Sequence, residues 1–311
     1  MIEELFSQYP KYHLLVASSQ LVLAMLGMGM VTHIRDFVEI VREPKPMITG
    51  ALYQLLGIPL LTIALVSLAT LPPEIVVGFF MLAAMPGGSM SNVFTFLAKG
   101  NSALSVALTG LMTFLALLTA PLILRLFAAD HIPPEIEMPV GSVMREIFLF
   151  LLIPLSVGMV LGRVLPVERA VKWSKWTIRG SLVILSILVV GSLGSGRIEV
   201  GAYGWRIPIL VFVYCLGIQV VALRGSLHLL KYSYRDSVAL GIESSMKNVN
   251  LGLLIAASLF ALEGDNAEFG GGVLFVLLLY GGISLFVSGV PAIRSFRRAN
   301  RLTAEENAAG R

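Results

Sequence analysis

The chain has 311 residues, of which 56% are hydrophobic and 14% are charged, and its formal net charge is +4. A soluble domain carries about 25% charged residues, whereas several stretches here run for roughly 17–25 residues without a charge, the length that crosses a bilayer. These features exclude a soluble enzyme, a disordered chain and a nucleic-acid-binding protein. They predict an all-α polytopic membrane protein, in which surplus lysine and arginine are typical of cytoplasmic loops.

Nine apolar stretches follow one another along the chain, and we interpret each as a membrane-spanning helix. In chain order they cover residues 14–31, 47–71, 75–97, 103–127, 140–161, 176–194, 207–223, 237–262 and 271–293. The connections between them are short, so residues 1–311 are expected to form a single membrane domain. The polar tail from residue 294 onward is expected to be loose.

Lysine and arginine residues are distributed unequally over the connections. With nine spans, seventeen of them fall on one side of the membrane and five on the other. The side with more cations is expected to face the cytoplasm. The N-terminus would then lie outside and the C-terminus inside, in a bacterial inner membrane or a plasma membrane.

Cysteine and histidine give no indication of a metal centre. Cys215 is the only cysteine, and no pair among the four histidines has the spacing of an HExxH motif. A disulfide framework and a metal site other than one for sodium are therefore not expected.

The third span is interrupted by small and polar residues. Roughly 16 Å into the span, near the midplane, the sequence reads Pro86-Gly87-Gly88-Ser89-Met90-Ser91-Asn92. Proline and two glycines do not hold a regular helix easily. A plain kink would account for them, but a kink does not need two serines and an asparagine. We interpret the segment as a break whose freed backbone is covered by protein or a water-filled cavity.

The eighth span carries charges deep in its apolar sequence. Glu243 is about 10 Å and Lys247 about 16 Å from the start of the span. Charges at such depth are costly and indicate a functional site. The alternative is a structural ion pair, because the two residues are four apart and would face each other on a continuous helix. The sequence leaves open whether this helix breaks.

The two interruptions occupy corresponding places in two groups of three spans that enter the membrane from opposite sides, which is typical of an inverted-repeat secondary transporter. Their side chains supply the oxygen ligands that hard cations such as sodium prefer. Glu243 offers a carboxylate, and Ser91 and Asn92 offer neutral oxygens. Ser105 and Thr109 place two hydroxyls on one face of the fourth span, although such hydroxyls often bond only to their own helix backbone.

The chain resembles the bile acid:sodium symporter family. The resemblance extends over essentially the whole chain and is carried by residues 86–92, 97–109 and 243–248. It implies a core domain in which two discontinuous helices cross at their unwound centres, beside a panel domain. The panel would comprise residues 14–31, 140–161 and 176–194, and the core residues 47–127 and 207–293.

The resemblance also implies the site residues. One sodium ion would be held by five residues, which are Ser91, Asn92, Ser105, Thr109 and Glu243. A second sodium site of the family is altered: Gln54 matches, but Lys247 stands in place of a glutamine and Ser245 in place of a glycine. Because of these departures, the resemblance does not imply a second sodium ion or the family's coupling ratio.

We expect a symporter, not an enzyme, that moves an organic anion such as a bile acid or small carboxylate by alternating access. Ser89 and Asn248 are the expected substrate contacts. The partners would be the anion, sodium and membrane lipid, with no nucleic acid; the oligomeric state is open.

Other readings of the sequence remain. In a proton-coupled or sodium-independent carrier, Lys247 would replace one sodium ion. An arsenite-type exporter would be expected to place a thiol at the break, but Cys215 lies outside both breaks. A non-transporting receptor would bind its ligand without uptake.

Overall fold

The computed structural model describes residues 2–32, 44–134, 136, 140–194, 201, 203–260 and 267–309, with the backbone alone described at 2–10, 89, 192–193 and 290–309. Over these residues the chain forms helices and no strand, with one isolated antiparallel β-bridge. The all-α prediction is therefore confirmed.

The helices are α1 (Ile2–Val31), α3 (Pro44–Leu52), α4 (Ile58–Leu68), α5 (Pro73–Ala84), α6 (Ser89–Leu97), α7 (Ser102–Phe127), α8 (Val140–Glu146), α9 (Ile153–Val164), α10 (Val167–Gly194), α11 (Arg206–Arg224), α12 (Tyr234–Ser245), α13 (Val249–Leu259) and α14 (Ala267–Ala309). The short turns are η1 (Tyr53–Gly57), η2 (Ala129–His131), η3 (Ile147–Leu152) and η4 (Gly225–Leu229), of which η2 is a 3₁₀-helix and the others are π-helices.

Two of the wide π-turns come just before a proline. Pro59 follows η1, and Pro154 follows η3. A proline has no N–H to donate and its ring clashes with the carbonyl four residues earlier. A locally wider turn relieves that clash while the helix continues.

Seven helices are long and apolar enough to cross a membrane, judged over the residues that the structure describes. They are Lys11–Val31, Pro44–Leu68, Ser102–Phe127, Val140–Val164, Val167–Gly191, Arg206–Leu229 and Ala267–Gly289. The other two expected spans, 75–97 and 237–262, are each divided into two short helices, α5 with α6 and α12 with α13.

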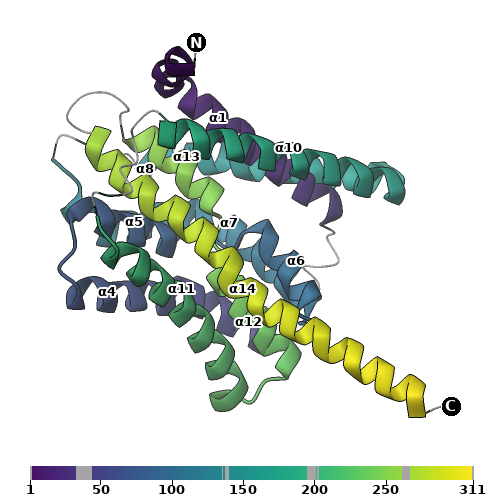
Figure 1. Ribbon diagram of the computed structural model, residues 1–311. Helices are drawn as coiled ribbons and strands as arrows, with labels where there is room; N and C mark the ends of the chain where they lie inside the picture. Colours follow the sequence, from purple (N-terminus) through teal and green to yellow (C-terminus); the bar gives the residue numbers. More distant parts are fainter. Residues whose placement is uncertain are drawn as a thin grey trace.

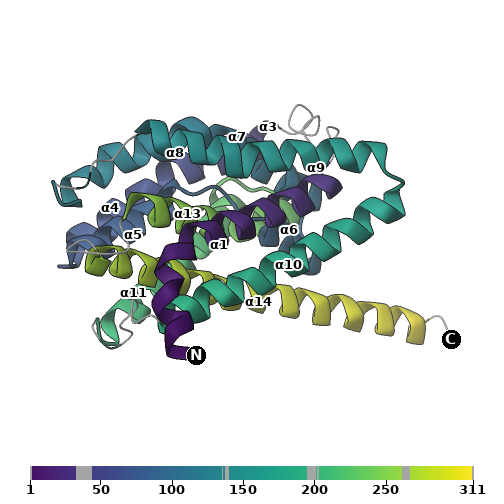
Figure 2. The ribbon, with the colours of Figure 1, turned by 90° about the horizontal axis from the view of Figure 1, so that it is seen from above.

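α1 packs along both α9 and α10, and in Figure 2 it lies between them. Small residues allow the close approach. A Cβ atom on Gly29 would overlap the carbonyl oxygen of Leu155, and one on Gly158 would overlap that of Leu26. Such close backbone contacts between glycines are typical of helix packing in membranes, where van der Waals contact is the main attraction.

The C-terminal helix is longer than the sequence predicted. α14 continues to Ala309 and extends beyond the other helices in both views (Figures 1 and 2). The expectation of a loose tail from residue 294 is therefore wrong. The tail is rich in alanine, arginine and glutamate, which favour helix, so an established helix extends through it.

Candidate functional site

The two divided helices meet at their breaks. Residues 85–88 separate α5 from α6, and residues 246–248 separate α12 from α13. The isolated β-bridge joins Gly87 in the first break to Lys247 in the second. The break expected in the third span is thus found, and the eighth span, which the sequence left open, is broken as well.

Backbone hydrogen bonds hold the two breaks together. The N–H of Gly88 donates to the carbonyl of Met246 at 2.7 Å, and the N–H of Asn248 donates to the carbonyl of Pro86 at 2.8 Å. An unpaired backbone group in an apolar environment is costly. Each break therefore supplies partners for backbone groups that the other break has freed.

The glycines of the first break are needed for the close approach. A Cβ atom on Gly87 would overlap Oε1 of Glu243, and one on Gly88 would lie 2.9 Å from the carbonyl oxygen of Lys247. The sequence indicated that these glycines interrupt a helix. The structure adds that they leave room for the partner break.

Glu243 lies at the end of α12 beside this crossing and is fully buried. Its Oε2 accepts hydrogen bonds from the hydroxyls of Ser91 and Ser105, and its Oε1 accepts one of 2.6 Å from Thr109. Ser91 comes from α6, and the other two hydroxyls come from α7. Two helices thus converge on a carboxylate that belongs to a third.

Asn92 completes the group, which we call the oxygen cluster (Ser91, Asn92, Ser105, Thr109 and Glu243). Its Oδ1 lies 2.8 Å from the Ser105 hydroxyl and 3.2 Å from the Thr109 hydroxyl. Each hydroxyl has a single hydrogen, which it can donate either to Asn92 or to Glu243. Thr109 is also within 2.9 Å of the Ser105 carbonyl in its own helix, so the local backbone contact exists alongside the cluster contacts. The structure brings together all five residues that the sequence predicted as ligands.

The oxygen cluster has the chemistry of a hard-cation site. It contains carboxylate, amide and hydroxyl oxygens and no nitrogen or sulfur ligand is needed. Hydroxyl hydrogens rotate freely, so the hydroxyls that donate to Glu243 can instead direct lone pairs at a cation. The donor set therefore fits sodium.

Gln54 and Lys247, the residues of the altered second site, are both buried, with 2% and 6% of their surfaces exposed. Neither the Gln54 amide atoms nor Lys247 Nζ has a hydrogen-bond partner among the residues described. A hydrogen-bonded ion pair between Lys247 and Glu243 is therefore absent from this part of the chain. That alternative required a continuous helix, and α12 ends at Ser245.

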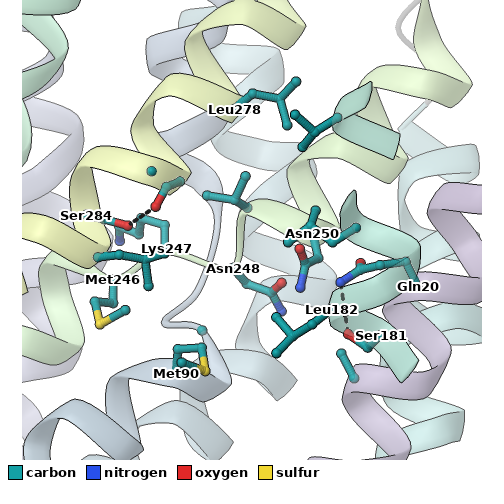
Figure 3. A pocket seen from close by; sticks show the side chains of 18 of the residues that line it. Gln20, Met90, Ser181, Leu182, Met246, Lys247, Asn248, Asn250, Leu278 and Ser284 are labelled. Carbon is teal, nitrogen blue, oxygen red and sulfur yellow. Dashed lines mark hydrogen bonds between the residues drawn. The ribbon is translucent and has the colours of Figure 1, made fainter. Parts of the chain in front are cut away.

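A cavity of about 400 Å³ opens beside the crossing, between α1 and α10 on one side and α6, α13 and α14 on the other (Figure 3). Lys247 and Asn248 line it, and most of the other lining side chains are apolar. Asn248 also caps α13, because its Oδ1 accepts a hydrogen bond from the N–H of Leu251. The side chain of Ser89, the other expected substrate contact, lies outside the description.

Two polar residues of the cavity were missed by the sequence analysis. Gln20 in α1 donates a 3.0 Å hydrogen bond to Ser181 in α10, and both line the cavity. Each is a polar residue inside an apolar stretch, which is the only signal that the sequence gives. A second omission is Tyr280 in α14, whose hydroxyl donates to the carbonyl of Ser245 beside the second break.

The chain matches the model of a known protein family. The model of the sodium bile acid symporter family matches residues 19–196. The chain belongs to this family. The resemblance noted in the sequence is therefore confirmed.

Relatives within the family carry the names of transporters. The uncharacterized sodium-dependent transporter YocS of Bacillus subtilis is 33% identical over 239 residues, which cover 77% of this chain and 73% of that protein. A probable chloroplast sodium/metabolite cotransporter of Arabidopsis thaliana is 29% identical over 77% of this chain and 58% of its own length. Sodium/bile acid cotransporter 4 of Mus musculus is 31% identical over 56% of this chain and 40% of its own. The chain is a membrane transporter and not an enzyme.

Proposed function

We propose that this symporter-family protein carries an organic anion across the membrane by alternating access, driven by sodium bound at the oxygen cluster. The observation that supports this most strongly is the clustering of four oxygen-bearing residues around the buried Glu243, at the point where two broken helices cross. A site shared between two half-helices changes when either half moves, which suits a carrier.

The proposed architecture has nine membrane crossings, with each divided helix pair counted once. α1, α8 with α9, and α10 form the panel, which is supported by the packing of α1 against α9 and α10. The remaining helices form the core as an inverted repeat, in which α3–α7 correspond to α11–α14. The N-terminus then lies outside and the C-terminus in the cytoplasm, as the distribution of cations favours.

The substrate is proposed to bind in the 400 Å³ cavity between panel and core. Ligand pockets for small molecules have volumes of roughly 300–1,000 Å³. α6 and α13 both begin beside this cavity, and the partial positive charge at a helix N-terminus favours an anion. Ser89 and Asn248, at those helix starts, are the proposed contacts for a bile acid or small carboxylate.

The second cation position is proposed to be incomplete. Lys247 carries three donors and no acceptor, so it cannot serve as a ligand of sodium. In the family pattern, Gln54 belongs to the same second sodium site. The positive charge of Lys247 would take the place of the sodium ion at that site. This buried lysine is also the observation that favours the second candidate, a proton-coupled or sodium-independent carrier.

Sodium titration of thermal unfolding tests the proposal. Purified protein is heated in sodium chloride or potassium chloride at constant ionic strength, as wild type and as Asn92→Ala and Thr109→Val. Each variant removes one polar partner from a buried site, which costs ~1–3 kcal/mol and lowers the apparent sodium affinity by ~5- to ~150-fold.

Thr119→Val is the matched control, because Thr119 lies on the same helix as Thr109 but its hydroxyl bonds to the carbonyl of Leu115 and not to the oxygen cluster. It should keep the wild-type sodium response. If Asn92→Ala and Thr109→Val also keep it, or if sodium and potassium stabilise the wild type equally, the oxygen cluster is not the sodium site.

A further inference from the structure

Two charged side chains are buried at the crossing, and the structure gives them different surroundings. Glu243 is 0% and Lys247 is 6% exposed. Burying a charge without compensation costs several kcal/mol even after the protein relaxes. Each of the two groups therefore needs an opposite charge or a set of hydrogen bonds.

Glu243 has hydrogen-bond partners among the described residues, and the amine of Lys247 has none. The carboxylate accepts hydrogen bonds from three hydroxyls of the oxygen cluster. Lys247 Nζ has no hydrogen-bond partner among the described residues. The two groups are near enough to interact electrostatically but are not hydrogen-bonded to each other. The carboxylate is therefore held by the cation site, and the hydrogen-bonding capacity of the ammonium is left for another group.

The surroundings of Lys247 indicate an anionic ligand. Lys247 is the one charged residue among the described residues that line the cavity. The other polar side chains there are neutral: Gln20 bonds to Ser181, the hydroxyl of Ser284 bonds to its own helix and Asn248 caps α13. Asn250 adds a further amide (Figure 3). The rest of the lining is mostly apolar. Lys247 lines the cavity, and its Nζ is buried with no hydrogen-bond partner among the described residues. One lysine charge beside a mostly apolar cavity suits a monocarboxylate with an apolar body.

We propose that Lys247 is the built-in counter-charge of the transported anion, so that the carrier moves one sodium ion with one monovalent carboxylate and no net charge. The proposal rests on the function proposed above and adds the ion ratio and the residue that recognises the anion's charge. It takes Glu243 as ionised and Lys247 as protonated.

These charges would explain why the movement of sodium is coupled to the movement of the anion. In the empty carrier, the charges of Glu243 and Lys247 cancel. Sodium alone leaves one excess positive charge, the anion alone leaves one excess negative charge, and both together cancel again. A net charge in a dry site is costly, so the empty and the fully loaded carrier exchange sides readily, whereas the half-loaded forms do not.

Ligand binding by charge variants tests the role of Lys247. The probes are straight-chain carboxylates from butyrate to octanoate, and cholate, each compared with its primary amide in a thermal unfolding assay with sodium present. Wild type should be stabilised by a carboxylate and not by its amide. Lys247→Met should weaken carboxylate binding by about tenfold or more, because a charge-assisted bond is lost, and should remove the preference for the acid.

Two further variants separate this role from general damage. Lys247→Arg keeps the charge and should keep the preference for the acid. Lys172→Met removes an exposed lysine of α10 and should behave as wild type. Lys247→Met should still be stabilised by sodium alone, because the oxygen cluster is intact. If sodium does not stabilise the wild-type protein, that result would instead count against the proposed function itself.

Transport in proteoliposomes tests the ion ratio. With a sodium gradient and the best-binding carboxylate of the panel, uptake should produce no current on a solid-supported membrane, and its rate should not respond to a potassium diffusion potential set with valinomycin. A current carried by net positive charge, equal binding of acid and amide by wild type, or no stabilisation by any carboxylate would overturn the proposal.

Discussion

Replacing Gly87 by alanine adds one methyl group at the closest point of the helix crossing. The new Cβ would overlap Oε1 of Glu243 and would lie 3.3 Å from the carbonyl oxygen of the same residue. Either the carboxylate must move away or the two breaks must separate. Both movements disturb the oxygen cluster, although Gly87 contributes no side chain to it.

The size of the effect follows from the bonds at risk. If the carboxylate moves, it weakens hydrogen bonds to hydroxyls, and bonds to a charged group contribute ~1.5–3 kcal/mol each. If the breaks separate, the backbone bonds of 2.7 and 2.8 Å that join them lengthen, at ~0.5–1.5 kcal/mol each. Inserting a methyl group into a packed site costs ~1–3 kcal/mol in its own right. Sodium affinity should therefore fall by at least about tenfold.

The assay is the sodium titration of thermal unfolding, with Gly217→Ala as the control. Gly217 lies within α11, and a Cβ there would meet nothing within 4 Å. That variant should be as stable as wild type or more so, because alanine favours helix over glycine by ~0.5–1 kcal/mol. A Gly87→Ala protein with the wild-type sodium affinity would refute the reasoning, because the crossing would then have room that the structure does not show.

Two other predictions concern the helix ends and the topology. Asn101 caps α7 by accepting a hydrogen bond from the N–H of Leu104 and donates one of 2.8 Å to Asp236; Asn101→Ala should lower the free energy of unfolding by ~0.5–2 kcal/mol, measured by thermal denaturation, and an unchanged stability would show that neither bond contributes. Cysteine tags placed at Glu3 and Asn307, in a background with Cys215 replaced by alanine, should be labelled from opposite faces of the membrane; labelling from the same face would mean an even number of crossings.

The sequence by itself determined the class of protein and most of the residues of interest. Apolar stretches of bilayer length require helices, because the membrane interior offers no partner for an unpaired backbone group. Polar residues in such stretches are few, so Glu243 and Asn92 stood out without any structure. Pro86 with the two glycines after it predicted the first break, since that local sequence does not hold a helix.

The second break was decided only by tertiary structure. Residues 244–248 can continue a helix or leave it, and nothing local favours one over the other. The choice depends on a backbone bridge to Gly87, about 160 residues away in the chain. The break also takes Lys247 out of helical register with Glu243, and the two side chains do not form the hydrogen-bonded pair that the four-residue spacing allowed.

Contacts between segments far apart in the chain could likewise not be predicted from the sequence. Gln20 and Ser181 are unremarkable polar residues until the packing of α1 on α10 places them together at the cavity. The group that Lys247 interacts with is likewise decided by the tertiary structure. Its burial and charge could be predicted from its position in an apolar span, but the group it serves depends on which side of the crossing its amine occupies, and local spacing carries no information about that.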